Sequence, residues 1–141
     1  MSPPRILVVD DNPLNIIIAE VVLLAEQFTV ETAADGSEAL QKVASFHPDL
    51  ILMDIQMPGQ DGLEVTRILK ADPATRHIRV VAFTAFAMRG DEAKMRAAGC
   101  DGYLSKPIDV RTFGAQVQAC LAAPEGAPWR APITDAPRSA V

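Results

Sequence analysis

The sequence predicts a doubly wound α/β fold, in which a parallel sheet carries helices on both faces. Five short runs rich in apolar and β-branched residues alternate with longer segments of helix-forming residues. A strand-then-helix unit repeated five times favours parallel strands joined by helical crossovers. The length of 141 residues is that of one ordinary domain, so we expect one domain and not two.

The five strands are predicted at residues 5–9, 28–32, 49–53, 79–83 and 101–105. Each run is too short to be a buried helix and is bounded by turn-forming residues. Residue pattern alone does not distinguish helix from strand over residues 16–24, because this segment is apolar on nearly every face and includes many β-branched residues. Its length, with Asn12 as N-cap and Pro13 at the first helical position, favours a helix over a strand.

The later helices carry start and stop signals of their own. Their predicted starts are Asp35 with Glu38, Asp61 with Glu64, and Asp109, and their predicted ends are His47-Pro48, Asp72-Pro73 and Ala98-Gly99. An acidic N-cap followed three residues later by Glu has the spacing of a capping box, and proline or glycine stops a helix. These signals agree with the five strand positions.

Composition and charge exclude several classes of protein. With 49% apolar and 22% charged residues the chain resembles an average globular protein, and its net charge of −5 argues against direct nucleic-acid binding. The apolar stretch 16–25 is interrupted by Glu20 and is too short to span a membrane, and the amino end does not fit a signal peptide. We therefore expect a cytoplasmic protein without membrane insertion, whose Cys100 and Cys120 are reduced and packed.

Residues 124–141 differ in composition from the rest of the chain. We expect one folded domain over residues 1–123 and a disordered tail over 124–141, which holds four prolines and charges that cancel. The alternative for the tail is a short recognition segment anchored by Trp129. It is too short for an output domain. Met1 and the tail favour a complete product over a module cut from a hybrid protein.

Polar residues follow four of the predicted strands. Asp10-Asp11 follow the first strand, Asp54 the third, Thr84 the fourth and Lys106 the fifth. Ligands of open parallel sheets bind at the carboxyl ends of the strands, so we expect these side chains to converge.

Such a convergence predicts an aspartyl-phosphate site. Clustered carboxylates repel one another unless a cation lies among them, and Mg²⁺ takes one or two carboxylates together with water and phosphate oxygens. Asp54 could then act as nucleophile, while the hydroxyl of Thr84 and the ammonium of Lys106 bind the transferred group. Taken singly, each residue has an ordinary structural explanation, such as Asp10-Asp11 beside a helix N-terminus. Their joint placement favours the site.

Four segments carry a resemblance to a known family. "ILVVDDNPLN", "PDLILMDIQMPGQDG", "VVAFTAFA" and "GYLSKPI", in this order, resemble the receiver domains of two-component response regulators, most closely single-domain regulators of the DivK type and the receivers of hybrid histidine kinases. The resemblance covers residues 5–122. It implies a flavodoxin-like (CheY-like) fold of five parallel strands in the order 2-1-3-4-5 with five helices.

The resemblance also implies roles for individual residues. Asp54 matches the phosphoacceptor, and Asp11 and Asp54 match Mg²⁺ ligands. The backbone carbonyl of Gln56 completes the ligand set, and Asp10 acts through a water molecule.

Further matches concern the phosphoryl group and the switch. Thr84 matches the switch hydroxyl, Lys106 the residue that pairs with the phosphoryl group, and Tyr103 the aromatic switch; a buried packing role is the alternative for Tyr103. The bond before Pro107 matches a cis peptide. Gln56 and Phe86 occupy positions that tune the phosphoryl lifetime, but a polar Gln and a bulky Phe argue in opposite directions, so the lifetime stays open.

The resemblance implies a response regulator that takes a phosphoryl group from a histidine kinase or phosphotransfer protein onto Asp54. Phosphorylation would switch protein binding at the face of the fourth helix, fifth strand and fifth helix, in a monomer or a weak phosphorylation-dependent dimer. It would catalyse only its own phosphorylation and dephosphorylation, so it is not expected to be an enzyme. Alternatives are a phosphorelay intermediate or phosphate sink, a hybrid-kinase module, a non-phosphorylated scaffold, and a Mg²⁺-dependent phosphohydrolase, which would need an acid where Gln56 stands.

Overall fold

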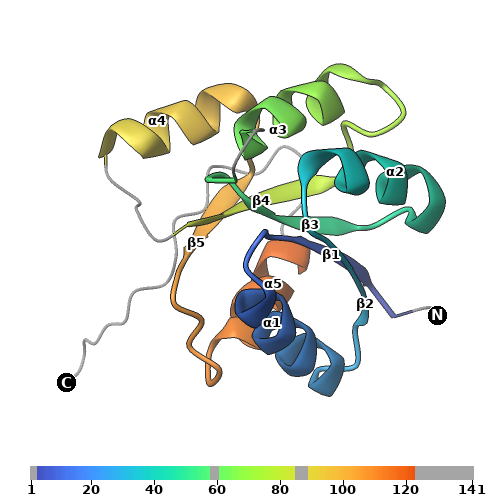
Figure 1. Ribbon diagram of the computed structural model, residues 1–141, viewed down its shortest axis with the longest axis vertical. Helices are drawn as coiled ribbons and strands as arrows, with labels where there is room; N and C mark the ends of the chain where they lie inside the picture. The colour runs from blue at the N-terminus through green and yellow to red at the C-terminus, as the bar shows by residue number, and fades with distance from the viewer. Residues whose placement is uncertain (1–2, 58–60, 85–88, 123–141) are drawn as a thin grey trace.

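The computed structural model describes residues 3–57, 61–84 and 89–122. Strands and helices alternate throughout this part of the chain (Figure 1). The strands are β1 (Arg5–Val9), β2 (Thr29–Ala33), β3 (Leu50–Asp54), β4 (Arg79–Thr84) and β5 (Gly102–Ser105). The helices are α1 (Pro13–Ala25), α2 (Gly36–Phe46), α3 (Gly62–Ala71), α4 (Arg89–Ala98) and α5 (Phe113–Ala122).

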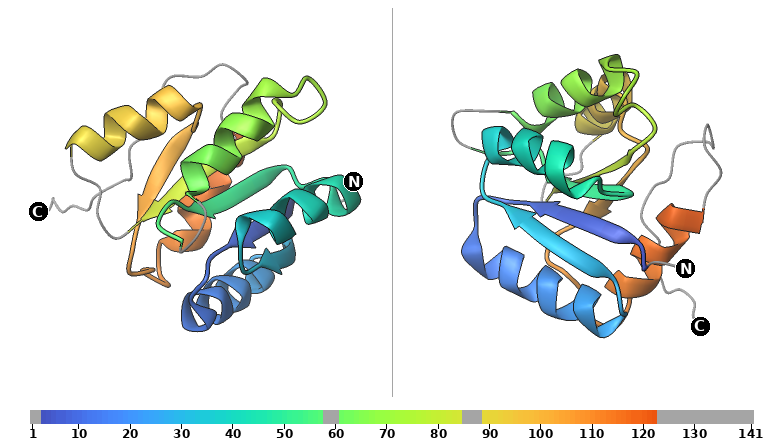
Figure 2. Two further views of the ribbon diagram at one scale, coloured as in Figure 1. Left: turned by 45° about the horizontal axis from the view of Figure 1, so that its top comes forward. Right: turned by 90° about the vertical axis from the view of Figure 1, so that its right-hand side faces the viewer.

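The strands form one parallel sheet in the order β2-β1-β3-β4-β5. Helices α1 and α5 cover one face, and α2, α3 and α4 cover the other (Figures 1 and 2). The predicted fold class and strand order are therefore confirmed. This topology brings the carboxyl ends of β1, β3, β4 and β5 to the same edge of the sheet.

The core has two parts because successive residues of a strand face opposite sides of the sheet. In β1, Ile6 and Val8 belong to the cluster beneath α1 and α5, whereas Leu7 and Val9 belong to the cluster beneath the other helices. All four are completely buried. Burial on both faces explains why the strands have continuous apolar runs instead of an alternating pattern.

The predicted strand limits differ from the observed ones by one residue at several ends. β2 and β3 start and end one residue later than predicted, and β4 extends to Thr84. The sheet pairs Asp54 with Phe83 and Thr84 with Ser105, so hydrogen bonding to a neighbouring strand decides where each strand ends. Asp54 and Thr84 are consequently the last residues of their strands and not the first residues after them.

The helix caps at α1 and α2 are confirmed with one change. The Asn12 side chain accepts a hydrogen bond from the Leu14 N–H, with Pro13 at the first position. The Asp35 carboxylate accepts from the Glu38 N–H at 2.8 Å. The Glu38 carboxylate does not return to Asp35 itself, because it accepts from the N–H one residue earlier, that of Ala34, at 2.9 Å.

The predicted cap at Asp109 is displaced. Its carboxylate accepts from the Arg111 N–H at 3.0 Å within a turn, and α5 begins only at Phe113. Asp109 therefore caps the turn that leads into the helix. Asp61 is the N-cap of α3, but its side chain accepts from the N–H of Leu63 and not from that of Glu64.

Further predictions concern the cysteines, membrane-spanning helices and the last residues of the chain. Cys100 and Cys120 are both buried, and neither is in a disulfide, as expected. Within the described residues no helix is both long and apolar enough to cross a lipid bilayer. The predicted tail with Trp129 and the lifetime position Phe86 lie outside the described residues.

Glycine is required where α4 ends. Gly99 has φ +104°, and a Cβ there would lie 2.8 Å from Cγ of Lys70. The Lys70 ammonium is held by the carbonyl of Ile78 at 2.8 Å and by Asp101 at 3.0 Å, so its side chain is not free to turn away.

We expect Gly99→Ala to lower the free energy of unfolding by about 1–3 kcal/mol, because alanine is strained at positive φ. Urea denaturation followed by circular dichroism measures this. Gly114→Ala is the control, since Gly114 has no positive φ and its added methyl would meet only the side chain of Glu26. A loss of stability as large in the control would contradict the explanation.

Candidate functional site

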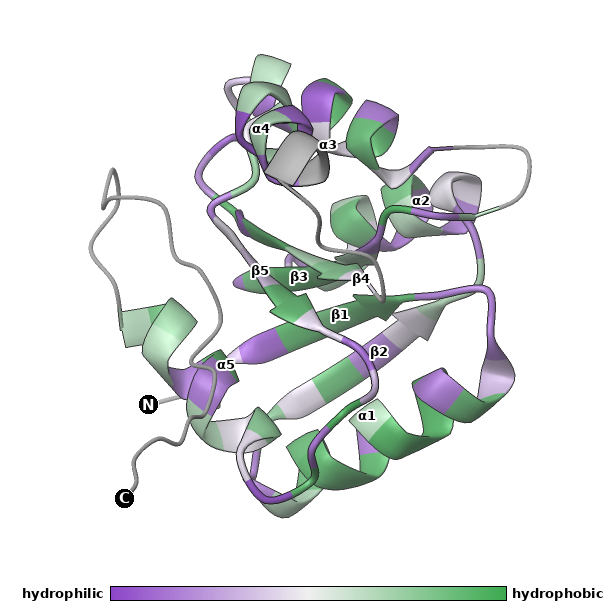
Figure 3. Ribbon diagram, turned by 90° about the vertical axis from the view of Figure 1, so that its left-hand side faces the viewer, coloured by the Kyte–Doolittle hydropathy of each residue, from purple (hydrophilic) through white to green (hydrophobic). Residues whose placement is uncertain are grey.

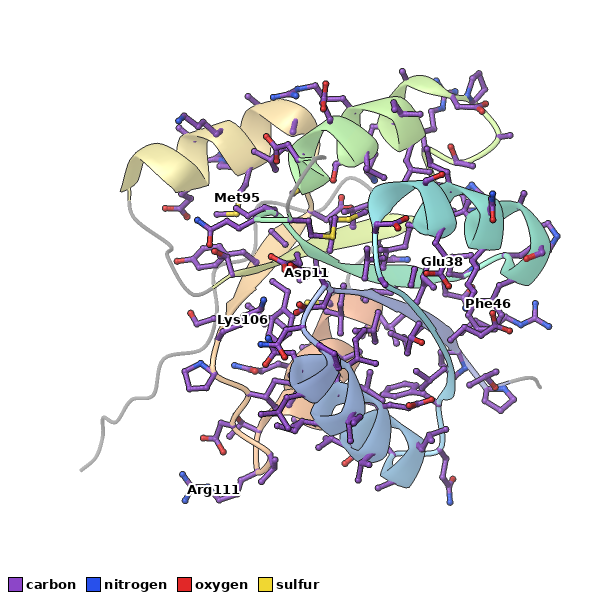
Figure 4. The ribbon with its side chains drawn as sticks, viewed as in Figure 1. Asp11, Glu38, Phe46, Met95, Lys106 and Arg111 are labelled. Carbon is purple, nitrogen blue, oxygen red and sulfur yellow. The ribbon has the colours of Figure 1, made fainter. Side chains whose placement is uncertain are left out.

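The predicted site residues meet at the carboxyl edge of the sheet. Asp10 follows β1, Asp54 ends β3 and Lys106 follows β5. The Lys106 N–H donates to the Thr84 carbonyl at 2.8 Å, which holds the end of β5 against β4. Figure 4 shows Asp11 and Lys106 near this edge, although they come from loops at opposite ends of the sequence.

Two carboxylates are oriented by the backbone in the same way. Oδ1 of Asp10 accepts from the N–H of Asn12, and Oδ1 of Asp54 accepts from the N–H of Gln56, each at 2.9 Å. The second oxygens of both carboxylates then face Lys106. Its Nζ lies 2.9 Å from Oδ2 of Asp10 and 3.3 Å from Oδ2 of Asp54.

These charges are shielded from water. Asp10 and Asp54 are 1% and 3% exposed, and the Lys106 ammonium lies over the Phe83 ring, 5.1 Å from its centroid. Oδ2 of Asp10 accepts no hydrogen bond despite its short distance to Lys106, so their contact is electrostatic. A buried carboxylate oxygen without a hydrogen bond is costly unless another positive group reaches it.

A third carboxylate completes an acidic cluster. One oxygen each from Asp10, Asp11 and Asp54 lies within 4.8 Å of the others. At that distance two like charges repel by roughly 3 kcal/mol near a protein surface. Lys106 balances one of the three charges and leaves an excess of two. Hard oxygen donors with this excess suit a divalent cation such as Mg²⁺.

The pKa of Asp54 is raised from 3.8 to about 6, chiefly by burial and also by the neighbouring Asp10. The Gln56 N–H and the Lys106 ammonium act in the opposite direction. Asp54 is therefore mostly ionised near neutral pH but holds a poorly solvated charge. A desolvated carboxylate can act as a nucleophile.

The two predicted switch residues lie on β4 and β5. Thr84 is buried at the end of β4, at 1% exposure. Tyr103 pairs with Ala82 in the sheet and packs, half-buried, against the cluster beneath α2, α3 and α4. Burial and the nearby Glu92 raise the pKa of Tyr103. Strand alternation puts Thr84 and Tyr103 on the same face as Ala82, the face that α4 covers.

The structure thus brings together Asp10, Asp11, Asp54 and Lys106, with Thr84 joined to Lys106 through the backbone. The peptide bond before Pro107 is cis, as expected. Gln56 contributes its N–H to Asp54, while the metal-ligating role of its carbonyl stays a prediction.

The sequence analysis missed an exposed apolar stripe on α1. It consists of Leu14, Ile17, Val21 and Leu24, which are 51–62% exposed. Their spacing of three, four and three residues marks one face of a helix and was visible in the sequence. The ribbon of α1 is coloured hydrophobic over most of its length in Figure 3. The stripe explains this composition: Ala19 and Leu23 are buried on the side toward the sheet, and no other part of the described chain covers the stripe on the opposite side.

We expect Asp54→Asn to stabilise the protein at pH 7.5 without divalent cations by roughly 1–3 kcal/mol, at 1.36 kcal/mol per unit of pKa shift. Asparagine can still accept from Gln56 but removes the buried charge. Because the folded protein binds this proton more tightly than the unfolded chain, wild-type stability falls as pH rises from about 4 through about 6. The gain should therefore vanish near pH 4.

Urea denaturation across this pH range checks the prediction. Asp72→Asn is the control, because Asp72 is exposed and its Oδ1 likewise accepts a backbone N–H, that of Ala74. Its effect should stay within about 0.5 kcal/mol. An Asp54→Asn variant no more stable than wild type at pH 7.5 would contradict the electrostatic explanation.

Comparisons with known proteins point to one family. The family described as response regulator receiver domain matches residues 6–118. The chain is 46% identical over 116 residues to the polar-differentiation response regulator DivK of Brucella ovis, covering 82% of this chain and 94% of that protein. It is 44% identical over 119 residues to DivK of Brucella anthropi, covering 84% and 97%.

Solved structures agree. The chemotaxis protein CheY4 of Vibrio cholerae matches with a TM-score of 0.81 at 27% identity, covering 84% of this chain and 99% of that one. The receiver domain of the sensor histidine kinase PA1611 from Pseudomonas aeruginosa, with a magnesium ion coordinated in its active site cleft, matches with a TM-score of 0.78 at 32% identity, covering 86% and 100%. Together with the acidic edge of the parallel sheet, these matches show that the chain belongs to the response regulator receiver domain family of two-component signalling.

Proposed function

We propose that Asp54 is the residue that accepts the phosphoryl group. The observation that carries this proposal is that Oδ2 of Asp54 lies 3.3 Å from the Lys106 ammonium, at the sheet edge, while its Oδ1 is held by a backbone N–H. A bond forms between a carboxylate oxygen and the phosphorus of the donor, and the bond from phosphorus to the donor's imidazole nitrogen breaks. The released imidazole takes a proton from solvent.

We propose Mg²⁺ as the cation of the acidic cluster. Its ligands would be the carboxylates of Asp11 and Asp54 and the backbone carbonyl of Gln56, with Asp10 acting through water. The excess of two negative charges and the all-oxygen donor set support a divalent hard cation over a softer metal. When bound, the ion neutralises phosphate oxygens and lowers the repulsion that a phosphorylated donor meets at the cluster.

Lys106 and Thr84 would bind the oxygens of the transferred group. Lys106 starts from contacts with Asp10 and Asp54, so it already lies beside the reacting oxygen. Thr84 lies at the end of the adjacent strand. Tyr103 is half-buried beneath α2, α3 and α4. Its side chain would move when that of Thr84 moves, and this would alter the face of α4, β5 and α5 where a downstream protein binds. Such a change shifts an existing equilibrium between two conformations.

The protein donor would dock on the apolar stripe of α1. Helix α1 begins two residues after Asp11, so the stripe is continuous with the site. A cavity of about 270 Å³ beside Asp11 is lined partly by Ile16 and Ile17 of the same helix. An exposed apolar face with the spacing of a helix seam suits an amphipathic helix of the phosphoryl donor.

We further propose a cytoplasmic protein that catalyses its own phosphorylation and dephosphorylation but no external reaction. Two buried cysteines without a disulfide fit a reducing compartment. If the phosphoryl group is passed on to a phosphotransfer protein, the chain is a relay intermediate. A rate of onward transfer faster than the rate of hydrolysis would distinguish a relay intermediate from a regulator that hydrolyses its own phosphoryl group.

We expect the chain to gain the mass of one phosphoryl group when incubated with Mg²⁺ and acetyl phosphate. Intact-mass spectrometry measures the gain, which should be absent without Mg²⁺ and absent in Asp54→Asn. Because that variant is expected to be folded and stable, its failure to react would result from loss of the Asp54 carboxylate and not from unfolding. A gain that survives the substitution would place the acceptor elsewhere, and turnover of many equivalents would indicate a phosphohydrolase.

The docking proposal has a separate test. Val21→Glu should slow transfer from a phosphorylated histidine kinase by about tenfold or more, because a charge replaces an apolar contact at a helix interface. Transfer from acetyl phosphate should stay within about twofold of wild type. The kinase used is the one that phosphorylates the wild-type chain fastest in a panel.

The matched control is Ile68→Glu, which puts the same charge on α3 at a side chain of similar exposure, 50%. It should change neither rate. If Val21→Glu accepts phosphate from the kinase as fast as the control does, the donor does not use this stripe.

A further inference from the structure

The first residue of α3 lies directly against the end of β3. A Cβ built on Gly62 would lie 2.2 Å from the carbonyl oxygen of Asp54 and 2.9 Å from Cα of Ile55. Both are backbone atoms, so neither can turn away as a flexible side chain would. Any other residue at position 62 would therefore force helix and strand apart at the proposed acceptor.

Hydrogen bonds within α3 keep its first turn regular, and buried side chains pack this turn on the core. The N-cap Asp61 accepts from the Leu63 N–H at 2.9 Å, and Oγ1 of Thr66 donates to the carbonyl of Gly62 at 2.9 Å. Thr66 is completely buried and Leu63 nearly so. The first turn is thus fixed by hydrogen bonds and by packing.

The far end of the helix is anchored as well. Nζ of Lys70 donates to the Ile78 carbonyl at 2.8 Å and to Asp101 at 3.0 Å. Asp101 also accepts from the Val80 N–H at 2.9 Å. The far end of α3 is thus tied to the rest of the protein by hydrogen bonds, and its first turn is held against the core by the burial of Leu63 and Thr66. A methyl group on residue 62 would therefore press on the end of β3.

The end of β3 determines how the Asp54 carboxylate and the Gln56 carbonyl are oriented. The Asp54 carboxylate takes its direction from the Gln56 N–H, and Gln56 carries the carbonyl proposed as a ligand. A movement of roughly 1 Å at the reacting atoms can cost on the order of a hundredfold in rate.

We infer that Gly62 is a positioning residue for phosphorylation: by having no side chain, it lets α3 pack against the Asp54 carbonyl and thereby sets the Asp54 carboxylate and the Gln56 carbonyl. This inference rests on the proposed function of Asp54. Gly62 acts through Asp54 and Gln56 and does not itself contact the phosphoryl group.

Gly114 supplies a matched control. It lies at the second position of α5 and is buried, as Gly62 is at the start of α3. The three atoms nearest to a Cβ there would be side-chain atoms of the exposed Glu26, at 2.6–2.8 Å, and an exposed side chain can move. Thr66→Val is a second control, because it removes the bond to the Gly62 carbonyl without adding an atom next to Asp54.

The experiment measures phosphorylation of the full chain by acetyl phosphate as a function of Mg²⁺ concentration. It is run at 10 °C with trimethylamine N-oxide, which favours the folded state, and folding is checked by circular dichroism. Gly62→Ala should react at least about tenfold more slowly at saturating Mg²⁺. It should also need severalfold more Mg²⁺ for half-saturation. Gly114→Ala and Thr66→Val should stay within about threefold of wild type in both quantities.

A folded Gly62→Ala that matches wild type would overturn the inference, and so would an equal loss in Thr66→Val, which would indicate general destabilisation. A Gly62→Ala chain that stays unfolded would also overturn it, since the glycine would then serve folding itself. If wild type takes up no phosphate, the proposed function fails. The inference is then decided by the increase in melting temperature on adding Mg²⁺, expected to be smaller in Gly62→Ala than in both controls.

Discussion

Repulsion between three carboxylates at one edge of the sheet is the constraint on which the rest of the site depends, because the neighbouring groups must offset it. Asp10, Asp11 and Asp54 present oxygens within 4.8 Å of one another, and two of the side chains are almost fully buried. Lys106 relieves only part of this repulsion. The strands, which are buried on both faces of the sheet, supply the stability that holds these charges together when no cation is bound.

Asp54 is held by several contacts, whereas Thr84 and Tyr103 lie at the part of the sheet edge that α4 covers. Asp54 is held from several directions, by the Gln56 N–H, by Lys106 and by the start of α3. Thr84 and Tyr103 lie further along the sheet, beneath α4, where a change of side-chain position can reach the surface. If Asp54 is the acceptor and Thr84 and Tyr103 form the switch, as proposed, this arrangement places a held carboxylate beside the two residues that would respond to its phosphorylation.

The fold was largely predictable because burial on both faces leaves a strong local signal. Continuous apolar runs, the N-caps Asn12 and Asp35, and the stop at Gly99 all agree with the structure. The errors lie at element ends. Asp54 and Thr84 belong to their strands because neighbouring strands pair with them, and Asp109 caps a turn before α5. Pairing between strands far apart in the sequence is invisible to a local pattern.

By itself, the sequence determined the class of fold, the order of its elements and the residues that meet at the sheet edge, because strand direction and connection rules bring carboxyl ends together. Only the tertiary structure decided which oxygens of Asp10 and Asp54 face Lys106, that burial raises the pKa of Asp54, that one side of α1 stays uncovered, and that Gly62 lies against the Asp54 carbonyl. These properties depend on distances between separate elements, and such distances are set by packing across the whole core.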